Sequence, residues 1–304
     1  MPEAWDDALV AHRYAALGDV RLHYVEAGPA DGPLVVLLHG FPEFWYSWRH
    51  QIPALARAGF RVVAPDQRGY NLSDKPAGVR SYDARILAHD VERLVRACGA
   101  ARAHAVVGHD WGGGVAWLTA MRHPEVLGRL CVLNCPHPAR LLAAFLTARQ
   151  LRKSWYMFYF QLPFLPERSM AADDFASIRR TFRREPVRPE AFSDDDIQRY
   201  VDALSRPGAL TAAVNWYRAM FRQDPRRTLA ELRQPVAAPT LVLWGERDPH
   251  LGAELAEPDP ALVPDVRVVR IDDASHWVQV DAYERVNEAL LEFLRPERAA
   301  EAAA

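Results

Sequence analysis

An aspartate at position 110 stands where many hydrolases carry a nucleophilic serine. The stretch VVGHDWGGGVAW, residues 106–117, places Gly108 before Asp110, and Gly112 and Gly113 after it. A strand that turns sharply into a helix exposes its corner side chain, and small neighbours are needed because the two backbones pass close together. Asp110 is therefore a candidate nucleophile for a saturated carbon. The alternative is an N-cap of the following helix. Phosphate binding is disfavoured because neither phosphate-loop motif is present.

Two further residues follow at the ends of later apolar runs. Asp248 ends LVLWGERD, and His276 lies at the end of VRIDDASHW. Taken alone, Asp248 is an ordinary turn former before Pro249, and His276 an ordinary surface histidine. In the chain order nucleophile, acid, histidine, the three residues predict a catalytic triad at the carboxyl ends of strands.

The composition narrows the class of protein. Of 304 residues, 50% are hydrophobic and 25% charged, as in a globular protein, and 37 basic against 39 acidic residues leave a formal charge of -2. This balance of charges gives no indication of binding to nucleic acid or to an anionic membrane and suits a small neutral substrate.

No secretory signal or apolar run of membrane-spanning length is visible, so we expect a cytoplasmic protein. Neither a dinucleotide fingerprint nor a metal-binding spacing occurs, so no cofactor or metal is implied; Cys98, Cys131 and Cys135 are expected to be buried and reduced.

The elements that must position these residues alternate along the chain. Apolar, β-branched runs predict strands at 20–28, 33–40, 61–69, 103–110, 127–136, 239–248 and 266–277. Three- and four-residue apolar spacing predicts helices at 47–59, 83–100 and 281–296, the last stopped by Pro296. Between 138 and 234 helical segments rich in aromatic residues and arginine replace this alternation. We therefore expect a mostly parallel α/β core at 1–137 and 235–298, an inserted helical cap at 138–234 and a frayed tail at 299–304. Because ligands bind at the carboxyl ends of strands in such sheets, a pocket is expected under the cap.

The motifs HGFPEFWYSWR, APDQRGYNLSDKP, GHDWGG, NWYRA, GERD and SHW together resemble the epoxide hydrolase branch of the α/β-hydrolase family over nearly the whole chain. The resemblance implies an α/β-hydrolase fold in which the backbone N–H groups of Phe41 and Trp111 form an oxyanion hole. It also implies a cis peptide bond between Phe41 and Pro42. Tyr217 in NWYRA and Tyr156 in SWYMFYFQ match the two positions that bind the substrate oxygen, with Tyr159 as an alternative to Tyr156.

Aspartate in place of serine changes the reaction that the site can perform. A carboxylate is ionised at neutral pH without a base, and its attack on an sp³ carbon makes an alkyl ester and expels a leaving group. His276, oriented by Asp248, is then free to activate the water that hydrolyses this ester. An epoxide leaves as an alkoxide, so a proton donor that stays protonated at pH 7 is needed, and tyrosine meets this requirement. The prediction is hydrolysis of a small hydrophobic epoxide to a vicinal diol, with water as the second substrate.

Several other residues are expected near the site, where they bind substrate or support the loops. Phe41, Trp111, Trp155 and Trp216 are candidates for the apolar wall that binds substrate; ordinary core packing is the alternative. His39 is expected to be a hydrogen-bonded structural histidine that shapes its loop. In DQRGYNLSDKP, Arg68 and Asp74 are expected to brace a loop and not to touch substrate.

Two other functions remain open at this point. GHDWGG alone also suits a haloalkane or haloacid dehalogenase with the same triad, in which Trp111, and Trp155 or Trp216, donate hydrogen bonds to a halide, since the Phe41 ring donates none. A binding module without catalysis is also possible, since fold alone never establishes activity. A homodimer is compatible with the sequence.

Overall fold

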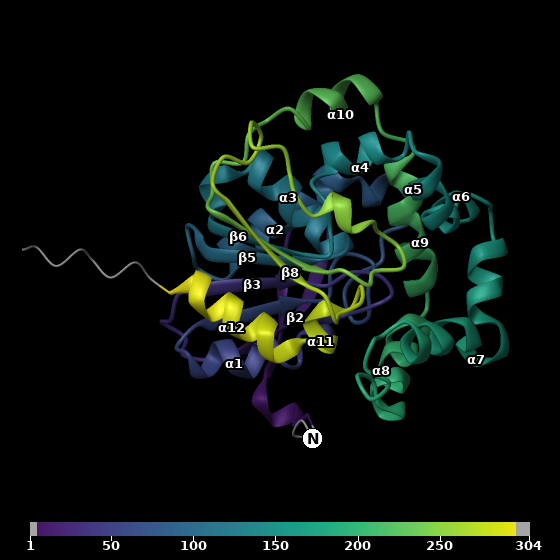
Figure 1. The fold of residues 1–304 in the computed structure, drawn as a ribbon. Helices are drawn as coiled ribbons and strands as arrows, with labels where there is room; N and C mark the ends of the chain where they lie inside the picture. Colours follow the sequence, from purple (N-terminus) through teal and green to yellow (C-terminus); the bar gives the residue numbers. More distant parts are fainter. Residues whose placement is uncertain (1–4, 296–304) are drawn as a thin grey trace, which may run out of the picture.

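One eight-stranded sheet forms the centre of the molecule (Figure 1). A computed structural model of the chain describes residues 5–295. The strand order is β1-β2-β4-β3-β5-β6-β7-β8. β2 pairs antiparallel with both β1 and β4, and all other neighbours are parallel. The strands are β1 Ala11–Ala16, β2 Arg21–Ala27, β3 Leu34–Leu38, β4 Arg61–Pro65, β5 Ala103–His109, β6 Leu127–Leu133, β7 Thr240–Gly245 and β8 Val266–Ile271.

Helices cover both faces of this sheet, so its central strands read as continuous apolar runs. Side chains alternate between two hydrophobic clusters: Val35 belongs to one, and Val36 to the other. The first face is covered by α1 (Gln51–Arg57), α11 (Val278–Asp281) and α12 (Tyr283–Leu294), and the second by α2 (Ala84–Ala97) and α3 (Trp111–Arg122) (Figure 1). Five short 3₁₀ helices lie between these elements: η1 Asp7–Leu9, η2 Trp45–Trp48, η3 Val79–Tyr82, η4 Pro124–Val126 and η5 Ala253–Leu255.

Every regular element between β6 and β7 is a helix. These helices are α4 Pro138–Ala144, α5 Ala148–Lys153, α6 Trp155–Tyr159, α7 Leu165–Arg184, α8 Asp194–Ser205, α9 Ala209–Met220 and α10 Pro225–Glu231. α7 is broken at 172–175, where Asp173, Asp174 and Phe175 have left-handed φ angles of 51°, 54° and 58°. Figure 1 shows α6 to α9 beside the sheet, past the ends of its central strands.

The sequence patterns located most of these elements but missed β1. The segment AHRYAA lacks the β-branched residues that mark a strand, and most of its side chains are exposed. It is a strand because it pairs along its whole length with β2, a tertiary contact that no local pattern reveals. Pro296 and the tail at 299–304 lie outside the described residues.

Candidate active site

Asp110 occupies the sharp turn between β5 and α3. Its backbone has φ 48° and ψ -120°, a conformation that is strained for a residue with a side chain. A Cβ on Gly108 would lie 2.2 Å from the carbonyl oxygen of Gly112, and one on Gly112 would lie 2.1 Å from that of Leu38. The turn therefore requires both glycines. Asp110 stands in the N-cap position of α3, but its side chain makes no capping hydrogen bond, so helix capping does not account for this aspartate.

The Asp110 carboxylate is held from the side of β3. The Phe41 backbone N–H donates to Asp110 Oδ2 at 2.9 Å, and the Phe41–Pro42 bond is cis, as the resemblance implied. Buried His39 shapes this loop as expected: its Nε2 accepts from the Gln67 backbone N–H at 3.1 Å. Trp111 begins α3, where backbone N–H groups have no partner within the helix. One oxygen of Asp110 is thus fixed by a backbone donor, as an oxyanion position requires.

Asp248 is a fully bonded carboxylate after β7. Its Oδ2 accepts from His276 Nδ1 at 2.7 Å and from Asn134 Nδ2 at 2.8 Å, and its Oδ1 accepts from the backbone N–H groups of His250 and Leu251 at 2.7 and 2.8 Å. Burial by itself would raise the pKa of Asp248, but the adjacent His276 and the hydrogen bonds lower it below its ordinary value. The carboxylate therefore stays ionised and orients the imidazole.

His276 links this carboxylate to Asp110. Its Nε2 lies 3.7 Å from Asp110 Oδ1, which is beyond hydrogen-bonding distance. The His276 imidazole therefore faces the Asp110 carboxylate without being bonded to it. Sequence reasoning missed Asn134, which fixes Asp248 from the end of β6; an asparagine directly after a buried strand was the available signal.

A second buried pair, His109 and Glu43, lies next to the loops that carry Asp110 and His276. His109 Nδ1 and Glu43 Oε2 are 2.8 Å apart and both side chains are fully buried, while His109 Nε2 lies 2.8 Å from the carbonyl oxygen of His276. Burial opposes both charges, yet mutual attraction lowers the pKa of Glu43 and raises that of His109. Glu43 Oε2 also accepts from the Gly40 backbone N–H at 3.2 Å. The pair therefore connects the loops that carry Phe41, Asp110 and His276.

Two cap tyrosines approach the site from α6 and α9. The rings of Tyr156 and Tyr217 are 6.0 Å apart, and Tyr217 packs edge-on against Trp111 at 4.9 Å. Burial and the nearby Asp110 charge raise the pKa of Tyr156 well above its usual range. Burial, with Tyr156 and then Asp110, does the same for Tyr217. Tyr159 points elsewhere, because its hydroxyl bonds Ser169 Oγ at 2.8 Å. Of the two alternatives, the structure therefore brings Tyr156 to the site.

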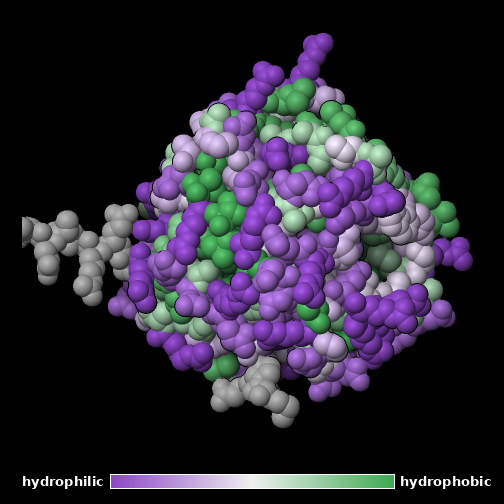
Figure 2. All heavy atoms as spheres, viewed as in Figure 1, coloured by the Kyte–Doolittle hydropathy of each residue, from purple (hydrophilic) through white to green (hydrophobic). Residues whose placement is uncertain are grey.

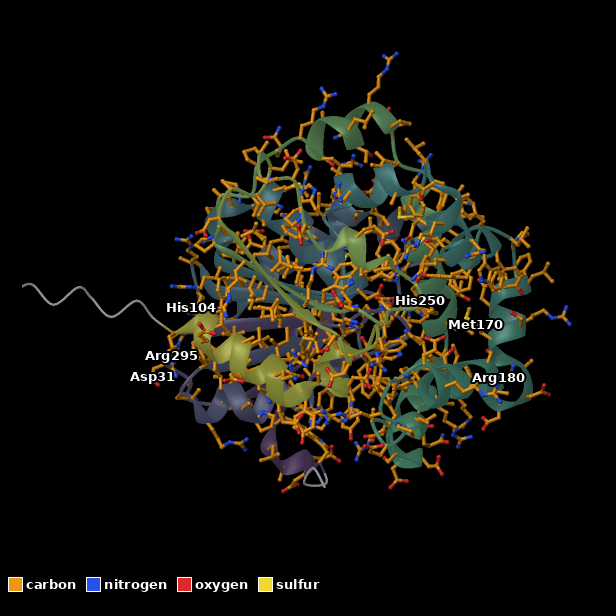
Figure 3. The ribbon with its side chains drawn as sticks, in the orientation of Figure 1. Asp31, His104, Met170, Arg180, His250 and Arg295 are labelled. Atoms are coloured by element: carbon orange, nitrogen blue, oxygen red, sulfur yellow. The ribbon has the colours of Figure 1, made fainter. Side chains whose placement is uncertain are left out.

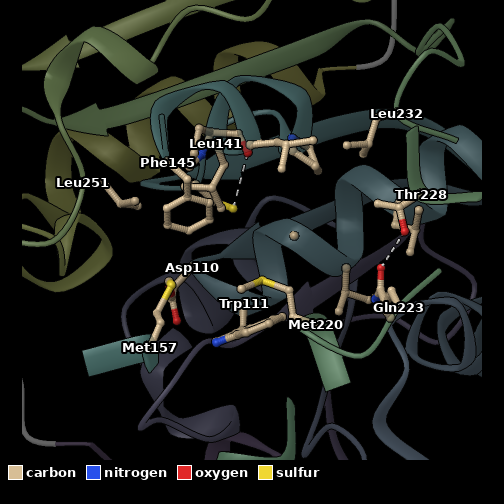
Figure 4. Close-up of a pocket in the computed structure, with 18 of the residues that line it drawn as sticks. Asp110, Trp111, Leu141, Phe145, Met157, Met220, Gln223, Thr228, Leu232 and Leu251 are labelled. Atoms are coloured by element: carbon tan, nitrogen blue, oxygen red, sulfur yellow. Dashed lines mark hydrogen bonds between the residues drawn. The ribbon is translucent and has the colours of Figure 1, made fainter. Parts of the chain in front are cut away.

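A cavity of about 290 Å³ opens in front of Asp110 (Figure 4). Tyr156 and His276 line it beside Asp110. From there it follows α3 toward α10, where Thr228 Oγ1 bonds Gln223 Oε1 at 3.2 Å. Its other lining side chains are mostly apolar and include Trp111, Val115, Leu118, Leu141, Phe145, Met157, Met220, Leu232 and Leu251. Such a cavity suits a small hydrophobic ligand.

Among the four residues expected in the pocket wall, only Trp111 lines this cavity. Trp155 was wrongly placed there: it is 63% exposed, because its position on α6 faces solvent. Trp216 is buried one layer behind Trp111, and its indole N–H donates to the Arg68 carbonyl at 3.0 Å, so it cannot reach a ligand. The Phe41 ring packs against Phe160 and Tyr217 instead of facing the cavity.

His250 and Glu185 form a further contact that sequence reasoning missed. His250 Nε2 lies 2.8 Å from Glu185 Oε2 at the end of α7, and its ring is 5.1 Å from that of His276. Figure 3 shows His250 at the junction of the core and the cap helices. Burial lowers the pKa of His250, but the Glu185 carboxylate, followed by Asp248, raises it above its ordinary value overall. This pair ties the loop after β7 to the cap.

The remaining expectations concern residues away from the reacting atoms. Arg68 forms ion pairs with Asp90 and Asp19, and Asp74 accepts from the Arg21 backbone N–H, so both brace loops as predicted. The three cysteines are buried and unpaired, also as predicted. Within residues 5–295, no group of three or more histidine, cysteine, aspartate or glutamate side chains is arranged to hold a metal ion.

Comparison with known proteins agrees with this geometry. The model of the α/β hydrolase fold family matches residues 33–283. The chain is 43% identical to the AB hydrolase superfamily protein YfhM of Bacillus subtilis, over 91% of this chain and 95% of that protein. It is 37% identical to epoxide hydrolase 4 of Mus musculus, over 96% and 82% of the two chains. The crystal structure of epoxide hydrolase A from Mycobacterium thermoresistibile superimposes with a TM-score of 0.82 at 34% identity, over 94% and 98%. The chain therefore belongs to the α/β-hydrolase family and, within it, to the epoxide hydrolase branch.

Proposed function

We propose that the protein hydrolyses epoxides to vicinal diols through a covalent ester on Asp110. The observation that carries this proposal is the arrangement around one cavity: a carboxylate with one oxygen bound by the Phe41 N–H, a histidine facing its other oxygen, and a protonated tyrosine in the same lining. Oδ1 of Asp110 attacks an epoxide carbon, the carbon–oxygen bond breaks, and Tyr156 or Tyr217 donates its proton to the departing oxygen.

The second step returns the enzyme to its starting state. His276 removes a proton from water, which attacks the Asp110 carboxyl carbon, and the N–H groups of Phe41 and Trp111 stabilise the resulting oxyanion. Asp248 stabilises the imidazolium that forms. The ester bond to the carboxyl carbon then breaks, and the His276 imidazolium protonates the departing alkoxide to complete the diol. The Asp110 carboxylic acid that forms loses its proton through water to the tyrosinate, which restores both groups.

The dehalogenase alternative has less support. A halide needs side-chain N–H donors, and of the three indoles considered for this role only Trp111 lines the cavity. The named relatives include epoxide hydrolases from animals and bacteria. Release of halide from alkyl halides, together with no diol from styrene oxide, would favour the dehalogenase instead.

Isotope labelling tests the covalent step. In a single turnover in ¹⁸O-water, the diol should carry unlabelled oxygen from Asp110, and the label should enter the Asp110 carboxylate. His276→Gln should slow ester hydrolysis, so intact-protein mass spectrometry should show an adduct of the epoxide mass. Asp110→Ala is the matched control, which should show no adduct. Label in the first-turnover diol would contradict the proposal.

A further inference from the structure

A cluster of exposed apolar side chains lies on the cap. Nine of the twelve large hydrophobic residues that are exposed in the described chain fall within residues 142–165 or at position 221. Their exposed fractions run from 38% at Leu151 to 88% at Leu146, with Phe164 at 77%. We call this set the cap patch: Leu142, Leu146, Leu151, Trp155, Phe158, Leu162, Phe164, Leu165 and Phe221. Figure 2 shows apolar residues exposed at the edge of the molecule where α6 lies in Figure 1.

Two members of the cap patch reach the cavity. Trp155 and Phe158 are three residues apart on α6, where such residues are neighbours, while Leu151 lies on α5 and Leu162 follows α6. The Phe158 ring contacts that of Phe221 at 5.4 Å. Leu142 and Phe221, which are 44% and 43% exposed, also line the cavity in front of Asp110. The rim of the cavity is therefore part of the exposed patch.

The charge around the cap patch differs from that of the whole protein. Residues 138–168 contain five basic residues and one acidic residue, Glu167, whereas the whole chain carries -2. Glu167 is paired with Arg218. Arg152, Arg168 and Arg222 are exposed, and no carboxylate of the described chain forms an ion pair with any of them. Arg149 pairs with Glu254 at 3.5 Å, where both side chains are largely exposed.

We propose that the cap patch docks on the surface of a bilayer containing anionic lipids. Exposed tryptophan, phenylalanine and leucine side chains together with arginines are the composition of elements that lie in a membrane interface. No helix of the described chain is long and apolar enough to span a bilayer, so this contact is peripheral. A second copy of the chain fits less well, because a two-fold contact would bring the same unpaired arginines face to face.

Docking in this way places the mouth of the cavity at the lipid. Leu142 and Phe221 would sit at the interface, and a hydrophobic epoxide could pass from the bilayer toward Asp110 without crossing water. This consequence for the substrate, a lipophilic epoxide dissolved in the membrane, rests on the proposed function; the docking itself does not.

Vesicle sedimentation with the full chain tests the docking. Binding to phosphatidylglycerol vesicles should exceed binding to phosphatidylcholine vesicles and should fall as salt is added. Trp155→Glu should weaken it by at least tenfold, because burial of the indole is lost. Arg152→Glu should weaken binding to the anionic vesicles by about fivefold or more, with little effect on the neutral ones. Leu9→Glu is the matched control, since Leu9 is 48% exposed in η1, outside the cap patch, and should bind like the wild type.

Three results would overturn the docking. One is no binding of the wild type to phosphatidylglycerol vesicles at low salt. Another is equal binding by Trp155→Glu and Leu9→Glu. The third is a dimer in analytical ultracentrifugation that Trp155→Glu, but not Leu9→Glu, converts to monomer, because the cap patch would then be an interface between copies of the chain.

Turnover separates the docking from the proposed chemistry. Trp155→Glu should lower hydrolysis of a long-chain terminal epoxide presented in phosphatidylglycerol vesicles, with no change for a small water-soluble epoxide. If the wild type binds vesicles but hydrolyses neither substrate, the proposed function fails and the docking stands. If it hydrolyses both but does not bind vesicles, the reverse holds.

Discussion

The two halves of the active site are held by different kinds of interaction. In the core half, Asp248 has four hydrogen-bond donors, and Asp110 is fixed by a strained turn and a backbone N–H. In the cap half, Tyr156 and Tyr217 are placed by aromatic packing against each other and against Phe160. Polar contacts between the halves include His250–Glu185 and the bond from Lys153 Nζ to the Asp248 carbonyl at 2.8 Å. Asp110 and His276 are thus held by hydrogen-bonded loops, while Tyr156 and Tyr217 depend on how the helices between β6 and β7 pack on the core.

Removing the nucleophile should have the largest effect on activity. Asp110→Ala leaves no group to form the ester, so kcat for epoxide hydrolysis should fall by at least about 10⁴-fold. The Tm should change little, since the side chain caps no helix. Steady-state kinetics and thermal unfolding measure the two effects. Residual activity within tenfold of the wild type would rule out a covalent role for Asp110.

Removing the proton donors tests the cap half. Tyr156→Phe and Tyr217→Phe should each lower kcat by roughly ten- to hundredfold, and the double variant by 10² to 10⁴-fold. Because both phenol pKa values are raised well above 10, the acid form should persist across the neutral range. We therefore expect no alkaline loss of activity from these groups below about pH 10. Tyr159→Phe is the control and should retain kcat, because its hydroxyl is bonded to Ser169.

Breaking the buried His109–Glu43 pair tests the core half. Glu43→Gln leaves His109 without its charge partner, so unfolding free energy should fall by about 3 to 5 kcal/mol in the range where both are charged. The lowered pKa of Glu43 stabilises the fold above about pH 4.3, and the raised pKa of His109 does so below about pH 6.5. The difference in unfolding free energy between Glu43→Gln and the wild type should shrink as the pH rises through the pKa of His109. Urea unfolding at several pH values measures it; a difference that does not vary with pH would contradict this account.

Breaking the His250–Glu185 contact, which joins the two halves, should have the smallest effect, and that effect should be on stability. Glu185→Gln removes the partner that raises the pKa of His250, so it should lower stability by about 0.2 to 1 kcal/mol. A histidine whose pKa is raised by folding stabilises the folded state fully below about pH 6.5. This stabilisation is lost as the pH rises through the pKa of the histidine in the folded state. Thermal unfolding at pH 6 should therefore show the loss and at pH 9 should not. Glu284→Gln, which breaks an ion pair with Arg188 and no histidine, should show no such pH dependence over this range.

Residues that local rules constrain could be predicted from the sequence, and those placed by packing could not. Glycines beside Asp110 and apolar runs before Asp248 and His276 marked the core half of the site, since strand ends of a parallel sheet meet at one edge. Trp155 was misplaced because its neighbour Tyr156 is turned inward on the same short helix, and residue type alone does not distinguish the two faces. Asn134, His250 and Glu185 come together only through tertiary contacts.

The sequence by itself determined the fold family and predicted the triad and the use of a carboxylate as nucleophile, because these depend on residue types at fixed positions in strand–turn–helix units. Tertiary structure alone decided which tyrosine and which indole face the cavity. It also decided that two of the nine exposed apolar side chains of the cap patch, Leu142 and Phe221, line the cavity. The reason is that burial and electrostatic interaction depend on distances across the fold. The net charge and composition of a chain contain no information about these distances.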